Sequence, residues 1–197
     1  MDKDKLRKYK QNYMNEISIR EARVSDAAGL ARVSVDSWQS TYAGIIPQEF
    51  LDSLTYAGRT KRWEERLSDP DSPGFTFVAE DDTGEIIGYA GGLKGNSGNP
   101  LYTGEVGDIY LLKEYQRQGT GRRLMATTAL RIKEYGHDSL LVWVLEDNPY
   151  RKFYESLGGS PVGKKEVEIG GRKLKEVAYG WADMKIFEEI LRSASKK

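Results

Sequence analysis

The sequence contains no cysteine and one histidine, His137. The lack of cysteine excludes disulfides, thiolate zinc sites, iron–sulfur clusters and a cysteine nucleophile. A single histidine excludes the HExxH pattern and any site with several histidine ligands, which leaves only carboxylate sites for a metal, and we expect none. His137 follows a helix-ending glycine and is typical of a surface residue.

Long apolar runs and an excess of charge of one sign are also missing. No run approaches the ~18 apolar residues of a membrane span, and the first 16 residues lack the apolar core of a signal peptide. The 30 basic residues balance 30 acidic ones, so no net field gathers phosphate backbones or anionic lipid. We therefore expect a cytoplasmic protein with neither nucleic acid nor a membrane as a partner.

The composition that remains is that of a globular domain. Hydrophobic residues make up 39% of the 197 positions, and the chain has 12 Tyr, 5 Phe and 4 Trp, enough for one core. We divide it into a charged N-terminal arm at residues 1–16, mobile or weakly helical, and a single domain at residues 17–197. The Lys/Glu-rich C-terminal helix is typical of a solvated face, and a contribution to a homodimer is the alternative.

Apolar spacing and turn residues predict the order of elements. They are a strand at 17–20, a helix from Ser25 that Gly44 ends, a helix from Pro47 to Leu67, strands at 75–80, 85–93 and 101–112, a helix at 119–135, a strand at 140–145, a helix at 148–157 with Asn148 as its N-cap, a hairpin at 162–169 and 172–184, and a C-terminal helix. The strand–helix–strand unit at 101–145 predicts one parallel pair. The order predicts an α+β domain around one mixed sheet.

The segment Gln116-Arg117-Gln118-Gly119-Thr120-Gly121 leads from a strand end into a helix. Two glycines let the backbone come close to a ligand, and free N–H groups at a helix start attract a phosphate or pyrophosphate. Arg122 and Arg123 follow directly and add positive charge. The segment therefore predicts an anion site, and a tight turn with solvated arginines is the alternative.

This run resembles the Q/R-x-x-G-x-G/A signature of the Gcn5-related N-acetyltransferase superfamily. The segment 148–158 resembles that superfamily's N-x-x-A-x-x-F-Y-x-x-L-G-F motif, and the stretch 38–47 is similar to a bacterial branch of it. Gly159 and Tyr150 depart from the motif, at the edge of its helix. The resemblance covers residues 17–184 and implies the acyl-CoA N-acyltransferase fold, a mixed, mostly antiparallel sheet flanked by helices, whose two parallel strands splay apart.

The resemblance also implies acetyl-CoA as co-substrate, no metal, and direct transfer of the acetyl group to a primary amine of a small molecule or a protein. The pantetheine arm would pair with the strand end at Ile109, Tyr110 and Leu111, since an extended amide-bearing ligand suits an open strand edge. The pyrophosphate would lie on the loop formed by Gln116, Arg117, Gln118, Gly119, Thr120, Gly121 and Arg122. Asn148 would reach the cofactor arm, and a purely capping role is its alternative.

Two residues match catalytic positions of the family. Tyr154 matches the tyrosine that acts as general acid at the thioester sulfur. A phenol with a pKa near ~10 protonates a thiolate near ~8.5 at a cost of about 2 kcal/mol, so its hydrogen bond must contribute. Glu105, eleven residues before Gln116, matches the catalytic glutamate of the histone acetyltransferase branch. Strand alternation predicts that Glu105 shares a face with Gly107 and Ile109, with Asp108 on the opposite face. Asp108 and a water chain are the alternative bases.

The acceptor site is predicted less sharply. Trp38 and Tyr42 match positions that line the acceptor pocket in relatives, although aromatic residues at helical spacing are also typical of a core. Glu105 and Asp108 near the reaction centre favour a cationic acceptor. A non-catalytic acyl-CoA-binding sensor is the alternative to an enzyme, and the retained Tyr154 argues against it.

Overall fold

The computed structural model describes residues 17–194, and the predicted N-terminal arm lies outside them. Seven strands form one sheet in the order β1-β2-β3-β4-β5-β7-β6. The strands are β1 (Ser18–Glu21), β2 (Gly74–Glu80), β3 (Ile86–Leu93), β4 (Gly104–Leu111), β5 (Leu140–Leu145), β6 (Ser160–Ile169) and β7 (Arg172–Trp181). Among these strands of residues 17–194, only β4 and β5 pair in parallel. The predicted α+β domain with a mixed, mostly antiparallel sheet is confirmed.

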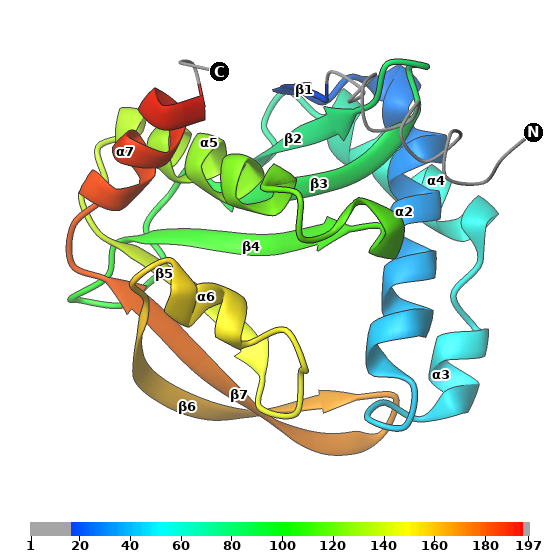
Figure 1. Cartoon of the computed structure of the whole chain (residues 1–197). Helices are drawn as coiled ribbons and strands as arrows, with labels where there is room; N and C mark the ends of the chain where they lie inside the picture. Colours follow the sequence, from blue (N-terminus) through cyan, green and yellow to red (C-terminus); the bar gives the residue numbers. More distant parts are fainter. Residues whose placement is uncertain (1–16, 195–197) are drawn as a thin grey trace, which may run out of the picture.

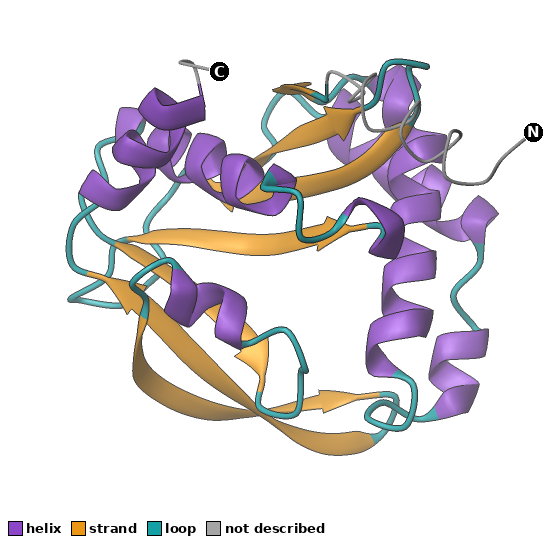
Figure 2. Ribbon diagram, in the orientation of Figure 1, coloured by secondary structure: helices purple, strands orange, loops and turns teal. Residues whose placement is uncertain are grey.

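Helices cover both faces of the sheet (Figures 1 and 2). They are α2 (Ala27–Tyr42), α3 (Gln48–Asp52), α4 (Tyr56–Ser68), α5 (Thr120–Glu134), α6 (Lys152–Ser156) and α7 (Lys185–Ala194), with short 3-10 turns η1 (Val24–Asp26) and η2 (Lys113–Tyr115). Because side chains alternate along β2, Phe77 packs with α5 residues such as Leu124, while Val78 packs with Leu30 of α2 and Trp63 of α4. None of the helices within residues 17–194 is long and apolar enough to cross a membrane.

The structure corrects two helix predictions. The helix expected from Pro47 to Leu67 is divided, because α3 ends at Asp52 and the Thr55 side chain caps α4, accepting a hydrogen bond from the Gly58 N–H at 3.1 Å. The helix expected at 148–157 begins only at Lys152. Asn148 is therefore not its N-cap, and instead organises the turn before it.

The feature that positions the site is the divergence of β4 from β5. The two strands pair only where Gly104–Val106 lie beside Leu140–Val142, and they separate beyond that point (Figure 2). Past Val106, β4 keeps β3 as its neighbour on one side and has no strand partner among residues 17–194 on the other. The sheet therefore contains an internal strand edge, as the resemblance implied.

A bulge in β4 overturns the predicted alternation. Val106 pairs with Gly92 and Asp108 pairs with Gly91, so Gly107 is left without a partner. Val106 belongs to the core beneath α5, and Ile109, three residues later, packs against the same core. Because of the extra residue, every side chain of β4 after the bulge points to the face opposite the one that strict alternation predicts.

As a result, Glu105 does not share a face with Ile109. Glu105 precedes Val106 and points to the opposite face from the α5 core, the face on which Asp108 lies near Arg66 of α4. Tyr110 packs on this face against residues of α2. Both carboxylates of β4 therefore lie on the side of α2 and α4.

Candidate functional site

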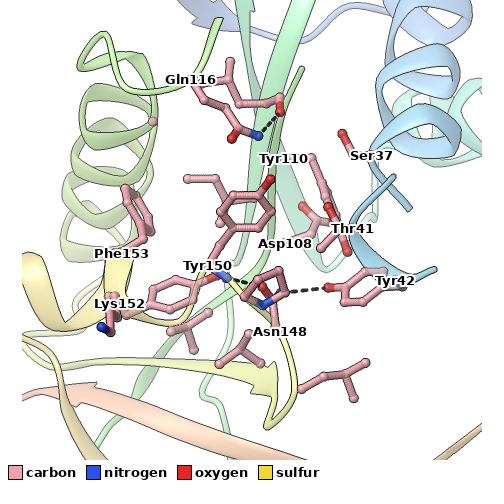
Figure 3. Close-up of a pocket in the computed structure, with 18 of the residues that line it drawn as sticks. Ser37, Thr41, Tyr42, Asp108, Tyr110, Gln116, Asn148, Tyr150, Lys152 and Phe153 are labelled. Carbon is pink, nitrogen blue, oxygen red and sulfur yellow. Dashed lines mark hydrogen bonds between the residues drawn. The ribbon is translucent and has the colours of Figure 1, made fainter. Parts of the chain in front are cut away.

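A cavity of about 700 Å³ occupies the space between β4 and β5 (Figure 3). Most of its wall comes from four parts of the chain: the C-terminal half of α2, the free edge of β4, the loop before α5 with the start of that helix, and the segment from β5 into α6. Ile169 of β6 and Glu176 of β7 complete the wall. The predicted site residues that line it are Trp38, Tyr42, Ile109, Tyr110, Leu111, Gln116, Arg117, Gly119, Gly121, Arg122, Asn148 and Tyr154. Three motifs that lie far apart in the sequence thus meet at one cavity.

The remaining three predicted residues do not line the cavity. Gln118 donates a hydrogen bond from its side-chain amide to the Glu114 carbonyl at 3.0 Å, and Thr120 is buried at the start of α5. Both therefore support the loop. Glu105 is half-buried further back on β4, where Lys165 and Glu176 are its charged neighbours, and burial raises the pKa of its carboxyl.

The loop before α5 has the geometry of an anion site. Arg117 and Gly119 both have positive φ, at 62° and 91°, and Gly119 is the N-cap of α5. Such left-handed residues turn successive backbone N–H groups toward a common point, at the positive end of the helix. Gln116 fixes the loop to β4 because its side-chain amide donates to the Leu111 carbonyl at 2.9 Å. A Cβ built at Gly121, the second residue of α5, lies 3.6 Å from Phe153, which is ordinary van der Waals contact.

Asn148 connects the two walls of the cavity. Its Oδ1 accepts a hydrogen bond from the Tyr150 N–H at 2.8 Å, and its Nδ2 donates to the Tyr42 hydroxyl at 3.2 Å (Figure 3). Tyr110 of β4 packs against the cluster that contains Tyr42. Burial raises the pKa of Tyr42, so its hydroxyl stays protonated at neutral pH. Asn148 thus organises its own turn and lines the cavity, although it does not cap α6.

Tyr154 sits on α6 among other aromatic residues. Its ring lies 5.3 Å from that of Phe153 and stacks on Tyr179 at 5.6 Å, which leaves 8% of the residue exposed. No other described residue, within 17–194, hydrogen-bonds its hydroxyl. Burial, as the largest cause, raises the pKa of Tyr154 well above its usual range, so the phenol keeps its proton and can donate a hydrogen bond to a ligand.

Asp108 is the carboxylate of β4 that faces the cavity. Its side chain is 25% exposed, and its Oδ2 lies 3.7 Å from Arg66 Nη1. The other oxygen, Oδ1, is buried without a hydrogen-bond partner among residues 17–194. Desolvation raises the pKa of Asp108, and the charge of Arg66 opposes this only in part. Such a carboxylate is a stronger proton acceptor than a solvated one.

Sequence reasoning missed several residues of the cavity wall. Ser37 and Thr41 line it beside Trp38 and Tyr42, and the four lie on one face of α2 (Figure 3). Counted from Ser37, the other three follow one, four and five residues later, which is the spacing of one helix face. This spacing is the sequence signal that could have identified Ser37 and Thr41. Phe153 and Trp143 also line the cavity, but nothing in their spacing separates them from core residues.

Comparison with known proteins identifies the class of this site. The chain matches the sequence model of the acetyltransferase (GNAT) family over residues 35–159. It is 39% identical over 175 residues to YuaI of Bacillus subtilis, an uncharacterized N-acetyltransferase, and the match covers 89% of this chain and 98% of YuaI. These matches define an acyltransferase. The chain belongs to the acetyltransferase (GNAT) family, as the two motifs predicted.

Solved structures share the fold. PaiA N-acetyltransferase from Thermoplasma acidophilum, in complex with coenzyme A, is 20% identical with a TM-score of 0.62, covering 84% of this chain and 99% of that one. The structure of yncA from Salmonella typhimurium, with its cofactor acetyl-CoA, is 19% identical with a TM-score of 0.62 over 84% and 93% of the two chains. Spermidine N-acetyltransferase SpeG from Vibrio cholerae is 17% identical with a TM-score of 0.63 over 87% and 96%. The predicted GNAT-like fold is confirmed.

Proposed function

We propose that the protein transfers the acetyl group of acetyl-CoA directly to a primary amine. The observation that carries this proposal is the single cavity that joins the free edge of β4 to the anion-binding loop before α5. The complexes of PaiA with coenzyme A and of yncA with acetyl-CoA support the choice of co-substrate. Acetyl-CoA supplies an acetyl thioester, which an uncharged amine can attack.

The residues of the cavity fit this co-substrate at both ends. The free backbone groups of Ile109 to Leu111 suit an amide-bearing arm, which would add to β4 as a short strand. The left-handed Arg117 and Gly119 and the start of α5 suit a pyrophosphate, and Arg122 adds a guanidinium to the same wall. Asn148, next to the end of β5, faces the space between these two groups.

Tyr154 is our candidate for the group that assists departure of the thiol. Tyr154 lines the cavity, and its hydroxyl is protonated and has no hydrogen-bond partner within residues 17–194 to give up. Because burial raises its pKa, complete proton transfer to a thiolate is less favourable than for a solvated phenol. The role that fits is donation of a strong hydrogen bond to the developing thiolate.

A carboxylate of β4 is our candidate for the base that removes a proton from the acceptor. An alkyl ammonium has a pKa near ~10.4, so this step is needed at neutral pH. Asp108 faces the cavity directly, whereas Glu105 lies behind it and would act only through a water chain. The geometry supports Asp108 over the sequence-based choice of Glu105.

The test is calorimetric titration with acetyl-CoA, followed by a free-thiol release assay with polyamines, amino acids, aminoglycosides and lysine peptides. Binding with turnover is the expected result. Binding without turnover of any amine would favour the non-catalytic sensor, and failure to bind would refute the proposal.

A further inference from the structure

A second cavity, of about 360 Å³, lies between α4 and β4. It shares Trp38, Gly107, Asp108 and Tyr110 with the main cavity, so the two meet at the bulge of β4. The rest of its wall is formed by Ser34, Arg59, Arg62, Trp63, Arg66 and Tyr89. We call it the arginine cavity. A ligand in it would approach Asp108 from the side opposite α5.

Three arginines give this cavity its charge. Arg59, Arg62 and Arg66 are spaced by three and four residues, which places them on one face of α4. Asp108 is the one acidic residue in its wall, and it lies near Arg66. Within the described range 17–194, no carboxylate forms an ion pair with Arg59 or Arg62. The wall therefore carries two positive charges in excess.

Aromatic rings hold two of these guanidinium groups in place. Arg59 lies over Trp38 at 5.5 Å from the ring centroid, and Arg66 lies over Trp63 at 5.1 Å. The Nε of Arg59 is buried and has no hydrogen-bond partner among residues 17–194. A guanidinium stacked in this way presents a fixed fork of N–H donors, which matches the paired oxygens of a carboxylate or phosphoryl group.

We infer that the acceptor is a small primary amine that also carries an acid group, and that the arginine cavity binds this acid group. The inference rests on the proposed function and names the substrate class of the same site. The amine would lie toward Asp108, where the arginine cavity meets the main one, and the carboxylate or phosphoryl oxygens would lie among Arg59, Arg62 and Arg66. This inference replaces the expectation of a cationic acceptor, which was based on Glu105 and Asp108 alone.

Charge and size both oppose a polyamine. A second ammonium group would enter a cavity with three guanidinium groups and one carboxylate, where like charges repel. The volume lies at the lower end of the ~300–1,000 Å³ range of small-molecule sites, and it suits a ligand of amino-acid size. The chemistry shared by amino acids, aminoalkyl phosphonates and amino phosphates is an anionic group near a primary amine.

The experiment compares matched acceptors in the thiol release assay. L-amino acids are paired with their C-terminal amides, which keep the amine and remove the charge of the acid group, and aminoalkyl phosphonates and spermidine form separate arms. Loss of a charge-assisted hydrogen bond typically reduces affinity about tenfold to a hundredfold. We expect kcat/KM to be higher by that factor for the acid-bearing member of the best pair, and the phosphonate arm distinguishes a carboxylate site from a phosphoryl site.

Variants on α4 connect the preference to the arginine cavity. Arg62 is exposed and forms no ion pair within the described part of the chain, so Arg62→Gln removes a charge with little effect on folding. We expect it to raise KM for the acid-bearing acceptor about tenfold, and to leave KM for the amide member unchanged. Lys61→Gln is the matched control, because Lys61 is the exposed neighbour on the same helix and lines neither cavity.

Several results would overturn the inference. The first is a kcat/KM for an amide or for spermidine that equals that of the acid-bearing amines. The second is that no acid-bearing amine is acetylated. The third is that Arg62→Gln and Lys61→Gln change KM equally. If acetyl-CoA binds and other amines are acetylated, the substrate class is wrong and the proposed function stands. If acetyl-CoA does not bind, the proposed function itself fails.

Discussion

Replacement of Tyr154 by phenylalanine separates catalysis from folding. Tyr154 lines the cavity, its hydroxyl has no hydrogen-bond partner among residues 17–194, and its ring packs against Phe153 and Tyr179. Tyr154→Phe keeps the ring and removes only a group that the folded chain does not use. We therefore expect the free energy of unfolding to change by less than ~0.5 kcal/mol.

The expected effect on turnover follows from the hydrogen bond to the leaving thiolate. A charge-assisted hydrogen bond in a dry site contributes about 1.5–3 kcal/mol, which corresponds to roughly tenfold to a hundredfold in rate. Tyr154→Phe should lower kcat by about a hundredfold, and KM for acetyl-CoA should change less than about twofold, because the bond forms only as the thiol leaves. Steady-state thiol release measures both constants.

Tyr179→Phe is the matched control. Tyr179 is fully buried, does not line the cavity, and donates its hydroxyl to Glu155 Oε1 at 2.8 Å. Its replacement should cost about 1 kcal/mol of stability, lower Tm by about 2–4 °C, and leave kcat unchanged. Unchanged turnover in Tyr154→Phe, or the same loss in both variants, would refute a role for the Tyr154 hydroxyl in the reaction.

Two further substitutions test other parts of the site. Desolvation raises the pKa of Asp108, so kcat/KM should fall as the pH drops through this raised pKa and the carboxyl gains a proton. Asp108→Asn should lower kcat/KM near neutral pH by about a hundredfold and abolish this decrease at acidic pH. A larger effect of Glu105→Gln would instead assign the role of base to Glu105. Gly119→Ala should destabilise the fold by about 1–2 kcal/mol in urea denaturation, because φ there is 91° and no atom lies within 4 Å of the new Cβ, so the cost is backbone strain alone. A Gly119→Ala variant as stable as the wild type would contradict the strained loop.

The sequence predicts the parts of the fold that depend on periodic burial and on turn residues. The hairpin at β2 and β3, the helix α5 ended by Gly136 with φ of 90°, and the parallel pair β4 and β5 all follow from such local signals. The interruption between α3 and α4 was missed because the apolar spacing continues across it, and only the capping hydroxyl of Thr55 indicates the break.

The site was predicted where a residue's role is local, and missed where it depends on neighbours distant in the sequence. The loop from Gln116 to Arg122 carries its own glycines and start of a helix, so its place was predictable. The bulge at Gly107 arises from pairing with β3, and it moves Glu105 to the face of Asp108. The stripe of Arg59, Arg62 and Arg66 is visible in the sequence, but only the packing of α4 beside β4 gives it a cavity to line.

The central claim, that acetyl-CoA binds on the loop before α5, is tested most directly by calorimetric titration of three proteins. They are the wild type, Gly121→Ala and Gly121→Glu. A Cβ at Gly121 lies in ordinary contact with Phe153, so both variants should fold, and circular dichroism checks this. We expect one acetyl-CoA bound per chain in the wild type, binding within about fivefold for Gly121→Ala, and none for Gly121→Glu, whose carboxylate lies at the anion site. Equal binding by wild type and Gly121→Glu, or no binding by the wild type, would contradict the account.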